Sequence, residues 1–233
     1  MNEQACFWGQ WSQATMHFCE AKLCDIIVQP ANAYSNLGFV LMGLYLFKIV
    51  DRRSLYVLFP ISSVLVGITS FLYHASWTFF FQVFDVTSMF TLSALMLSLN
   101  LLRLGKIGKK SLFYFYPTVV ILSGLLMFFL KGKSGEYIFG THIIFVLISE
   151  SILYLKKNQA DYSNLKVALL LFGISFFIWN MDAKEIWCRP DNHIWQGHAL
   201  WHVINAFCFY YLYRFYQQFS TLLTNEKALS GKN

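Results

Sequence analysis

The chain has 233 residues, of which 57% are hydrophobic and only 13% are charged. A soluble domain carries about 25% charged residues, so this composition excludes an ordinary soluble enzyme and favours a protein that crosses a membrane several times. The net charge of +6 would suggest an anionic partner for a soluble protein, but here we expect a lipid bilayer and no nucleic acid. No repeat or low-complexity tract divides the sequence, which predicts one membrane domain.

Seven apolar segments follow one another between short polar breaks. Each has about 17 to 25 residues, the length of helix that crosses a hydrocarbon core about 30 Å thick. We expect an all-α, seven-helix transmembrane domain over residues 31–219, an extramembrane segment at the surface over residues 1–30, and a cytoplasmic tail over residues 220–233. The predicted spans are 31–50, 54–76, 78–102, 111–130, 136–155, 165–181 and 194–215.

The basic residues predict how this bundle is oriented. Seven spans put the two ends of the chain on opposite sides, and loops rich in Lys and Arg stay in the cytoplasm. We therefore expect the N-terminus outside and the C-terminus in the cytoplasm, with no cleaved signal peptide. Of the 18 Lys and Arg residues, the N-terminal side holds only Lys22, Lys131, Lys133, Lys184 and Arg189.

Two histidines, His198 and His202, lie near the start of the last predicted span. Their spacing puts both imidazoles on one face of a helix, one turn apart. Ionisable groups inside a membrane are costly and indicate functional sites. Such a pair could also bond to backbone carbonyls or bind haem, although adjacent turns of one helix cannot supply opposite axial ligands to one iron. A metal site would need a further ligand from another span.

The predicted topology supplies that ligand. The second span runs outward, so His74 lies near its outer end and Ser70 lies one turn deeper. The third span starts outside and carries Asp85 about two turns in, near the depth of His198 and His202. Three imidazoles predict a zinc site of the open, catalytic type, with water as the fourth ligand. In such a site Asp85 would orient or deprotonate the water, and Ser70 would bond to a developing oxyanion.

This set of residues resembles the alkaline ceramidase family. The family is part of a superfamily of seven-helix membrane hydrolases that includes the adiponectin and progestin receptors and a branch that remodels GPI lipids. The serine, the aspartate and the three histidines carry the superfamily likeness. The motifs closer to ceramidases are Phe18-Cys19-Glu20, Asn32-x-x-Ser35-Asn36, and Trp179-Asn180-x-Asp182 followed by Cys188.

The resemblance implies zinc held by His74, His198 and His202, with Ser70 and Asp85 in catalytic roles. It implies hydrolysis of the amide of ceramide to a sphingoid base and a free fatty acid, in the outer, periplasmic or lumenal, leaflet. Catalytic residues do not fix the substrate, so two alternatives stay open. One is the same chemistry on another N-acyl lipid or a lipid ester, and the other is a lipid receptor in which zinc is structural.

Relatives in this family hold calcium through the N-terminal segment, but only Glu20 of those ligands is retained here. His17, Lys22 and Gln29 stand where other ligands would be expected, and the ammonium group of Lys22 could replace the cation. We therefore expect Ca²⁺ to be absent or weakly bound.

The family resemblance also implies a disulfide between Cys19 and Cys188, which an oxidising compartment permits. Cys6 and Cys24 fall on the same predicted side and are competing partners for either cysteine. Cys208 lies deep in the last span, where a free cysteine is expected to act as a small apolar residue.

The remaining polar residues favour simpler interpretations. We expect His193 to be solvated and His142 to be a hydrogen-bonded core histidine. Glu150 lies near the basic residues 156–157, which indicates a paired carboxylate or one that reaches the membrane surface. Asp182 is expected to cap the end of the sixth span or to lie near the site.

Overall fold

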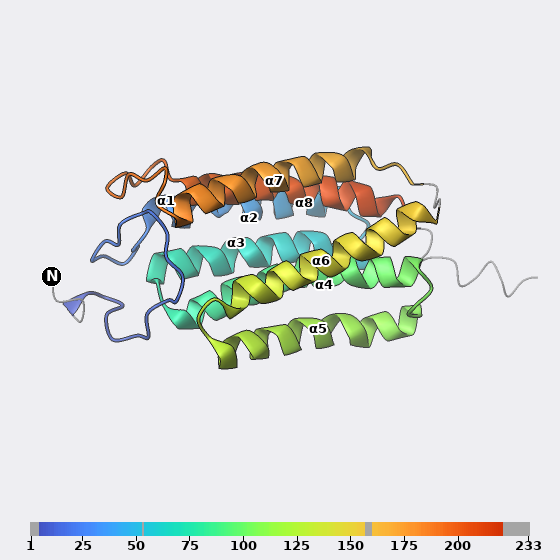
Figure 1. Cartoon of the computed structure of the whole chain (residues 1–233), viewed down its shortest axis with the longest axis horizontal. Helices are drawn as coiled ribbons and strands as arrows, with labels where there is room; N and C mark the ends of the chain where they lie inside the picture. The colour runs from blue at the N-terminus through green and yellow to red at the C-terminus, as the bar shows by residue number, and fades with distance from the viewer. Residues whose placement is uncertain (1–4, 53, 157–159, 221–233) are drawn as a thin grey trace, which may run out of the picture.

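The structure is a computed structural model that describes residues 5–52, 54–156 and 160–220. Within these residues the fold is all-α, with long helices lying side by side (Figure 1). A helix occupies each predicted span, which confirms an all-α fold with seven long helices in the described part of the chain. Most of the predicted tail, together with Arg53 and Lys157, falls outside the described residues. The elements are α1 (Pro30–Ser35), α2 (Leu37–Ile49), η2 (Leu55–Val57), α3 (Leu58–Ser76), α4 (Phe79–Arg103), α5 (Lys109–Leu130), α6 (Ser134–Leu155), α7 (Ser163–Ala183) and α8 (Gly197–Gln217).

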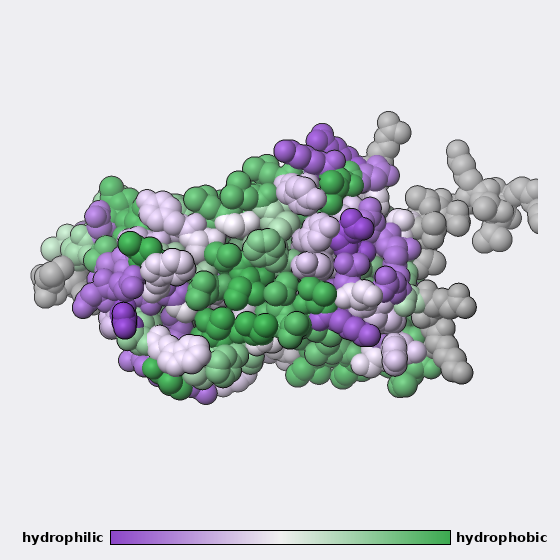
Figure 2. Space-filling model, turned by 90° about the horizontal axis from the view of Figure 1, so that it is seen from above, coloured by the Kyte–Doolittle hydropathy of each residue, from purple (hydrophilic) through white to green (hydrophobic). Residues whose placement is uncertain are grey.

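The surface of the bundle is that of a membrane protein. In the described part of the chain, five stretches are long and apolar enough to cross a membrane, namely Leu55–Ser76 and the helices α4, α5, α6 and α7. By contrast, α2 has only 13 residues, and α8 includes histidines, an asparagine and an arginine that make it less apolar. On the face shown in Figure 2, hydrophobic residues cover the middle of the molecule and polar residues gather towards its ends. This division matches a hydrocarbon core between two polar boundaries.

A very short connection fixes how α3 and α4 pack. Only Trp77 and Thr78 separate the two helices, and Trp77 reverses the chain by adopting a left-handed conformation with φ of 53°. The Thr78 hydroxyl then accepts a bond from the N–H of Phe81 and caps α4. The two helices must therefore run antiparallel, as the sequence predicted. On the other side of α3, Gly43 of α2 allows close approach, because a Cβ there would lie 2.5 Å from Val64.

A buried ion pair joins the helices at the end of the bundle opposite the N-terminal segment. Glu150 of α6 accepts two bonds from the guanidinium of Arg103, at 2.5 and 3.0 Å, and one from the Tyr162 hydroxyl at 2.9 Å. Of the two interpretations of Glu150, the structure shows the paired carboxylate, and the partner is Arg103 and not Lys156. The Glu150 side chain points into the bundle, where Arg103 of α4 is the neighbouring cation, whereas Lys156 is exposed.

The segment before α1 was predicted to lie at the surface, but the structure buries part of it. Phe18, Cys19 and Glu20 are only 3%, 4% and 1% exposed. This segment lies across the end of the bundle where α3 ends and α8 begins (Figure 1). A disulfide between Cys19 and Cys188 ties it to the loop before α8, which confirms the pairing that the family resemblance implied. Cys6 and Cys24 pair with each other, and Cys208 is free and buried.

Candidate metal centre

Three histidines meet in the interior beneath the N-terminal segment. His74 comes from the end of α3, and His198 and His202 come from the first two turns of α8. Their exposed fractions are only 0%, 4% and 3%. One potential ligand nitrogen from each ring lies within 4.8 Å of the others, and the Nε2 atoms of His74 and His198 are 3.2 Å apart. The convergence that the sequence predicted is therefore present.

The start of α8 is held in place by Asp182, which is fully buried at the end of α7. One carboxylate oxygen accepts a bond from the N–H of His198 and the other accepts a bond from the N–H of Cys19, both at 3.0 Å. A carboxylate is favourable at this position because the first N–H groups of a helix have no partner within the helix. Asp182 thus caps α8 and fixes the backbone of one histidine, which places it near the site, one of the two positions expected.

The hydrogen bonds of two rings determine which nitrogen is available to a metal. The Nδ1 atom of His74 lies 2.9 Å from the side-chain oxygen of Gln29, which can only accept, so Nδ1 carries the proton. The hydroxyl of Ser35 donates its single proton to the carbonyl of Asn32 at 2.9 Å, so it accepts from Nδ1 of His202 at 2.8 Å. Each neutral ring therefore keeps an unprotonated Nε2, which is the state of a metal ligand.

The third ring is held by stacking. Phe18 lies against His198 with ring centroids 3.7 Å apart and planes 21° apart. The Nδ1 atom of His198 is buried and has no hydrogen-bond partner within the described part of the chain. Because Nδ1 has no partner, the orientation of the His198 ring depends on its contact with Phe18 and on the contact of its Nε2 atom with Nε2 of His74.

The donor set fits zinc. Catalytic zinc is commonly bound by three neutral imidazoles, and two nitrogens on one tetrahedral zinc lie about 3.4 Å apart. The 3.2 Å separation of the nitrogens of His74 and His198 is close to this spacing. The rings are too close together for a haem between any two of them, because their centroids are only 4.4 to 5.1 Å apart. The structure thus favours a compact metal centre over the haem interpretation.

Ser70 and Asp85 form a second buried pair. The Ser70 hydroxyl lies close enough to the Asp85 carboxylate to interact with it, and both side chains are buried. Ser70 lies one turn from His74 on α3, so the two groups share one helix. In the part of the chain that the structure describes, the cluster of potential metal ligands contains only the three histidines. Asp85 is thus outside the group of potential ligands, and its catalytic role stays a prediction.

Glu20 has a position in the fold that its sequence motif does not reveal. Its two carboxylate oxygens accept bonds from the N–H groups of Ala31 and Asn32, both at 2.9 Å, and so cap α1. The Nδ1 atom of His193 lies 3.0 Å from the same carboxylate. The expectation that His193 is solvated was wrong, because the loop before α8 folds back onto Glu20.

Several contacts around the centre could not be anticipated from the sequence. Gln29 and Ser35 bond to histidines that are 45 and 167 residues away in the chain, and no spacing pattern connects such residues. The only signal for Ser35 was its place in a ceramidase-like motif. By contrast, His142 is confirmed as a core histidine, because its two ring nitrogens lie 2.9 and 3.0 Å from serine hydroxyls of α4 and α5.

Comparison with known proteins agrees with the fold and the site. The family model described as Ceramidase matches residues 10–231, a range that includes every residue of the histidine centre. Alkaline ceramidase 1 of Mus musculus is 24% identical to the chain over 218 residues, which cover 86% of this chain and 78% of that protein. The family match extends over nearly the whole sequence. The chain therefore belongs to the ceramidase family.

Proposed function

We propose that the protein is a zinc-dependent membrane hydrolase that cleaves the N-acyl amide of ceramide to a sphingoid base and a free fatty acid. The observation that carries the proposal is the buried group of three histidines with ligand nitrogens within 4.8 Å. Buried polar groups in a membrane are costly unless they have partners or a function. Membership of the ceramidase family supports an amide of a membrane lipid as the substrate.

In this proposal His74, His198 and His202 hold the metal. When bound, zinc supplies a Lewis acid for the amide carbonyl and makes water a nucleophile at neutral pH. Asp85 takes the proton of the attacking water and returns it to the leaving amine, as a general base and acid. The chain thus provides both the electrophilic centre and the proton carrier that amide hydrolysis needs.

The closeness of Ser70 to Asp85 supports a defined role for the serine. A hydroxyl has one proton to donate and a carboxylate is an acceptor, so in this proposal Ser70 donates a hydrogen bond to Asp85. We infer that Ser70 orients the proton carrier before reaction. A role at the oxyanion, as expected from the sequence, requires that this bond be released during the reaction.

We also infer that the histidine centre lies in the outer leaflet, with the N-terminus outside and the C-terminus in the cytoplasm. The two disulfides, Cys6–Cys24 and Cys19–Cys188, lie in the segments that cover the centre. Disulfides persist in oxidising compartments, which supports a periplasmic or lumenal location for this end of the bundle. The distribution of Lys and Arg in the sequence supports the same orientation.

The test is hydrolysis by the purified protein in detergent. It would be incubated with a panel of ceramides, other N-acyl amines, lipid esters and phospholipids, while bound metal is measured in parallel. We expect release of fatty acid from ceramides in preference to the other lipids. Cleavage of esters or other amides in preference to ceramide would reassign the substrate. Failure to cleave any lipid despite bound zinc would favour the receptor alternative.

A further inference from the structure

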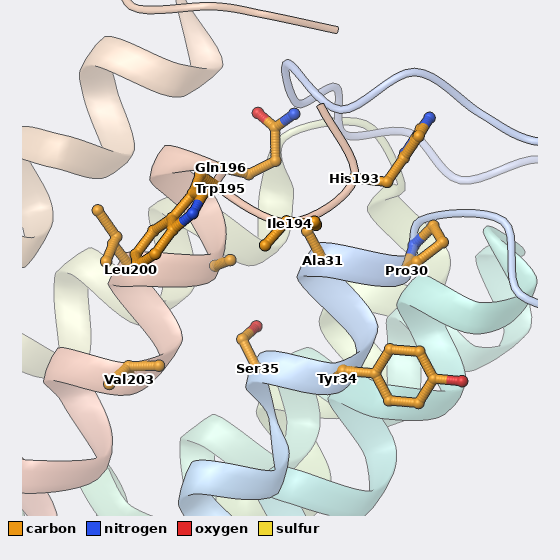
Figure 3. A pocket seen from close by; sticks show the side chains of 11 residues that line it. Pro30, Ala31, Tyr34, Ser35, His193, Ile194, Trp195, Gln196, Leu200 and Val203 are labelled. Atoms are coloured by element: carbon orange, nitrogen blue, oxygen red, sulfur yellow. The ribbon is translucent and has the colours of Figure 1, made fainter. Parts of the chain in front are cut away.

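A groove opens on the side of the bundle between α1 and the start of α8 (Figure 3). Its volume is about 400 Å³, within the range of about 300 to 1,000 Å³ that is typical of ligand pockets. Tyr34 and Ser35 of α1 form one side, and Leu200 and Val203 of α8 form the other (Figure 3). The groove therefore lies on the side of the bundle, near the end where α8 begins.

The groove is polar at one end and apolar along its length. His193 and Gln196 lie at its upper end in Figure 3, in the loop before α8. Towards the other end the lining is apolar, and Leu200 and Val203 remain 39% and 40% exposed. Among the described residues that line the groove, none has a carboxylate, ammonium or guanidinium group. This distribution matches an amphiphile whose polar group stays at the boundary while its hydrocarbon chain extends into the membrane.

Ser35 connects the groove to the histidine centre. It lines the groove, and its hydroxyl lies 2.8 Å from Nδ1 of His202. In Figure 3 it stands between Tyr34 on one side and the α8 residues on the other. Ala199 also lines the groove, directly after His198 in the chain. One layer of side chains thus separates a molecule in the groove from the proposed metal ligands.

The groove ends at a close contact between α2 and α8. A Cβ at Gly38 would lie 3.6 Å from the Cβ of Ala206 and 3.9 Å from the Cα of Val203, so the two helices touch just beyond the groove. The groove therefore extends from the boundary end of α8 to a depth about one turn past His198. A hydrocarbon chain that follows it is brought beside the histidines and no further between these helices.

We propose that this groove binds the acyl chain of the lipid substrate and thereby holds the lipid beside the histidine centre. The inference rests on the proposed function, because it assigns a binding site for the substrate of that centre. The occupant is a single hydrocarbon chain, whose chemistry matches the apolar walls, and the amide next to it meets the polar end of the groove.

Photo-crosslinking tests where the chain lies. The full-length protein in lipid nanodiscs would be exposed to a long-chain N-acyl lipid with a diazirine in its acyl chain, and adducts would be mapped by mass spectrometry. We expect adducts on Leu200 and Val203 in excess over Leu170, which is 63% exposed on α7 outside the groove. The same adducts are expected in His202→Ala, which is proposed to lack hydrolysis. Adducts spread over exposed apolar residues without enrichment in the groove would overturn the proposal.

A blocking substitution gives an independent test. Val203→Trp fills the groove, and we expect it to lower kcat/KM for a long-chain substrate by about tenfold or more, as changes of apolar fit do. Bound zinc is expected to stay at the wild-type level, which would show that the histidine centre is intact in this variant. Phe207→Trp is the matched control, because Phe207 is 53% exposed one turn further along α8 and does not line the groove.

The two tests separate the groove from the proposed function. If Val203→Trp hydrolyses the long-chain substrate as fast as the wild type, the groove does not bind the acyl chain, although the hydrolase assignment stands. If the wild type cleaves no lipid amide but the probe still crosslinks to Leu200 and Val203, the hydrolase assignment fails and the groove stands as a binding site for a hydrocarbon chain.

Discussion

Replacing Gln29 with leucine is expected to weaken zinc binding without removing a ligand. The substitution deletes the 2.9 Å bond that fixes the Nδ1 proton of His74. Loss of a hydrogen bond to the ring of a metal-binding histidine lowers metal affinity by about 10- to 100-fold, which is about 1.4 to 2.8 kcal/mol of binding free energy. The zinc dissociation constant of the purified protein, measured by competition with a chromophoric chelator, would detect a change of this size.

Two further variants make this prediction specific. Gln29→Glu keeps an oxygen acceptor for His74 but, like Gln29→Leu, loses the bond from the side-chain amide to the carbonyl of Glu20. We therefore expect Gln29→Glu to retain most of the zinc affinity. Ser93→Ala removes a 2.9 Å bond from His142, which lies outside the centre, and is expected to leave zinc affinity unchanged. Equal zinc affinity in the wild type and Gln29→Leu would refute the reasoning.

Three other predictions concern catalysis, calcium and stability. Asp85→Asn is expected to lower kcat by about 10²- to 10⁴-fold with bound zinc unchanged, and Ser70→Ala is expected to lower kcat less. Loss of zinc from Asp85→Asn would show that the carboxylate is a ligand and not a proton carrier. Chelation of calcium with zinc retained is expected to leave hydrolysis unchanged, and a strong loss of activity would restore a calcium site at the N-terminal segment. Arg103→Met leaves the buried carboxylate of Glu150 unpaired and is expected to lower the free energy of unfolding by about 3 to 5 kcal/mol. The double variant Arg103→Met/Glu150→Leu should recover most of that loss. A midpoint of thermal unfolding as low as that of Arg103→Met would contradict this.

The helices and the meeting of the histidines were predictable from local properties of the sequence. Continuous apolar runs define the spans, because a helix must be apolar over its whole length to cross a bilayer. Once the spans are fixed, their antiparallel order sets the depth of each polar residue. His74 and His202 could therefore be placed together although they lie on distant segments.

The contacts that complete the site were not predictable in this way. The stacking of Phe18 on His198 depends on how a non-helical segment folds over the end of the bundle. Such segments have no periodicity from which a direction could be read. The bond that Nδ1 of His202 donates to Ser35 depends on how the short helix α1 packs against α8. The pairing of Glu150 with Arg103 was missed for a different reason. It depends on how α4 and α6 are rotated about their axes, and the nearly uniform apolar composition of these spans does not determine that rotation.

The most direct test of the central claim is the zinc content of three proteins, measured together with their hydrolysis of ceramide. The wild type and His142→Ala, which removes a buried histidine outside the centre, are expected to bind about one zinc per chain and to release fatty acid. His202→Ala is expected to lose both the metal and the activity. Full zinc content and full hydrolysis in His202→Ala would contradict the assignment of the centre.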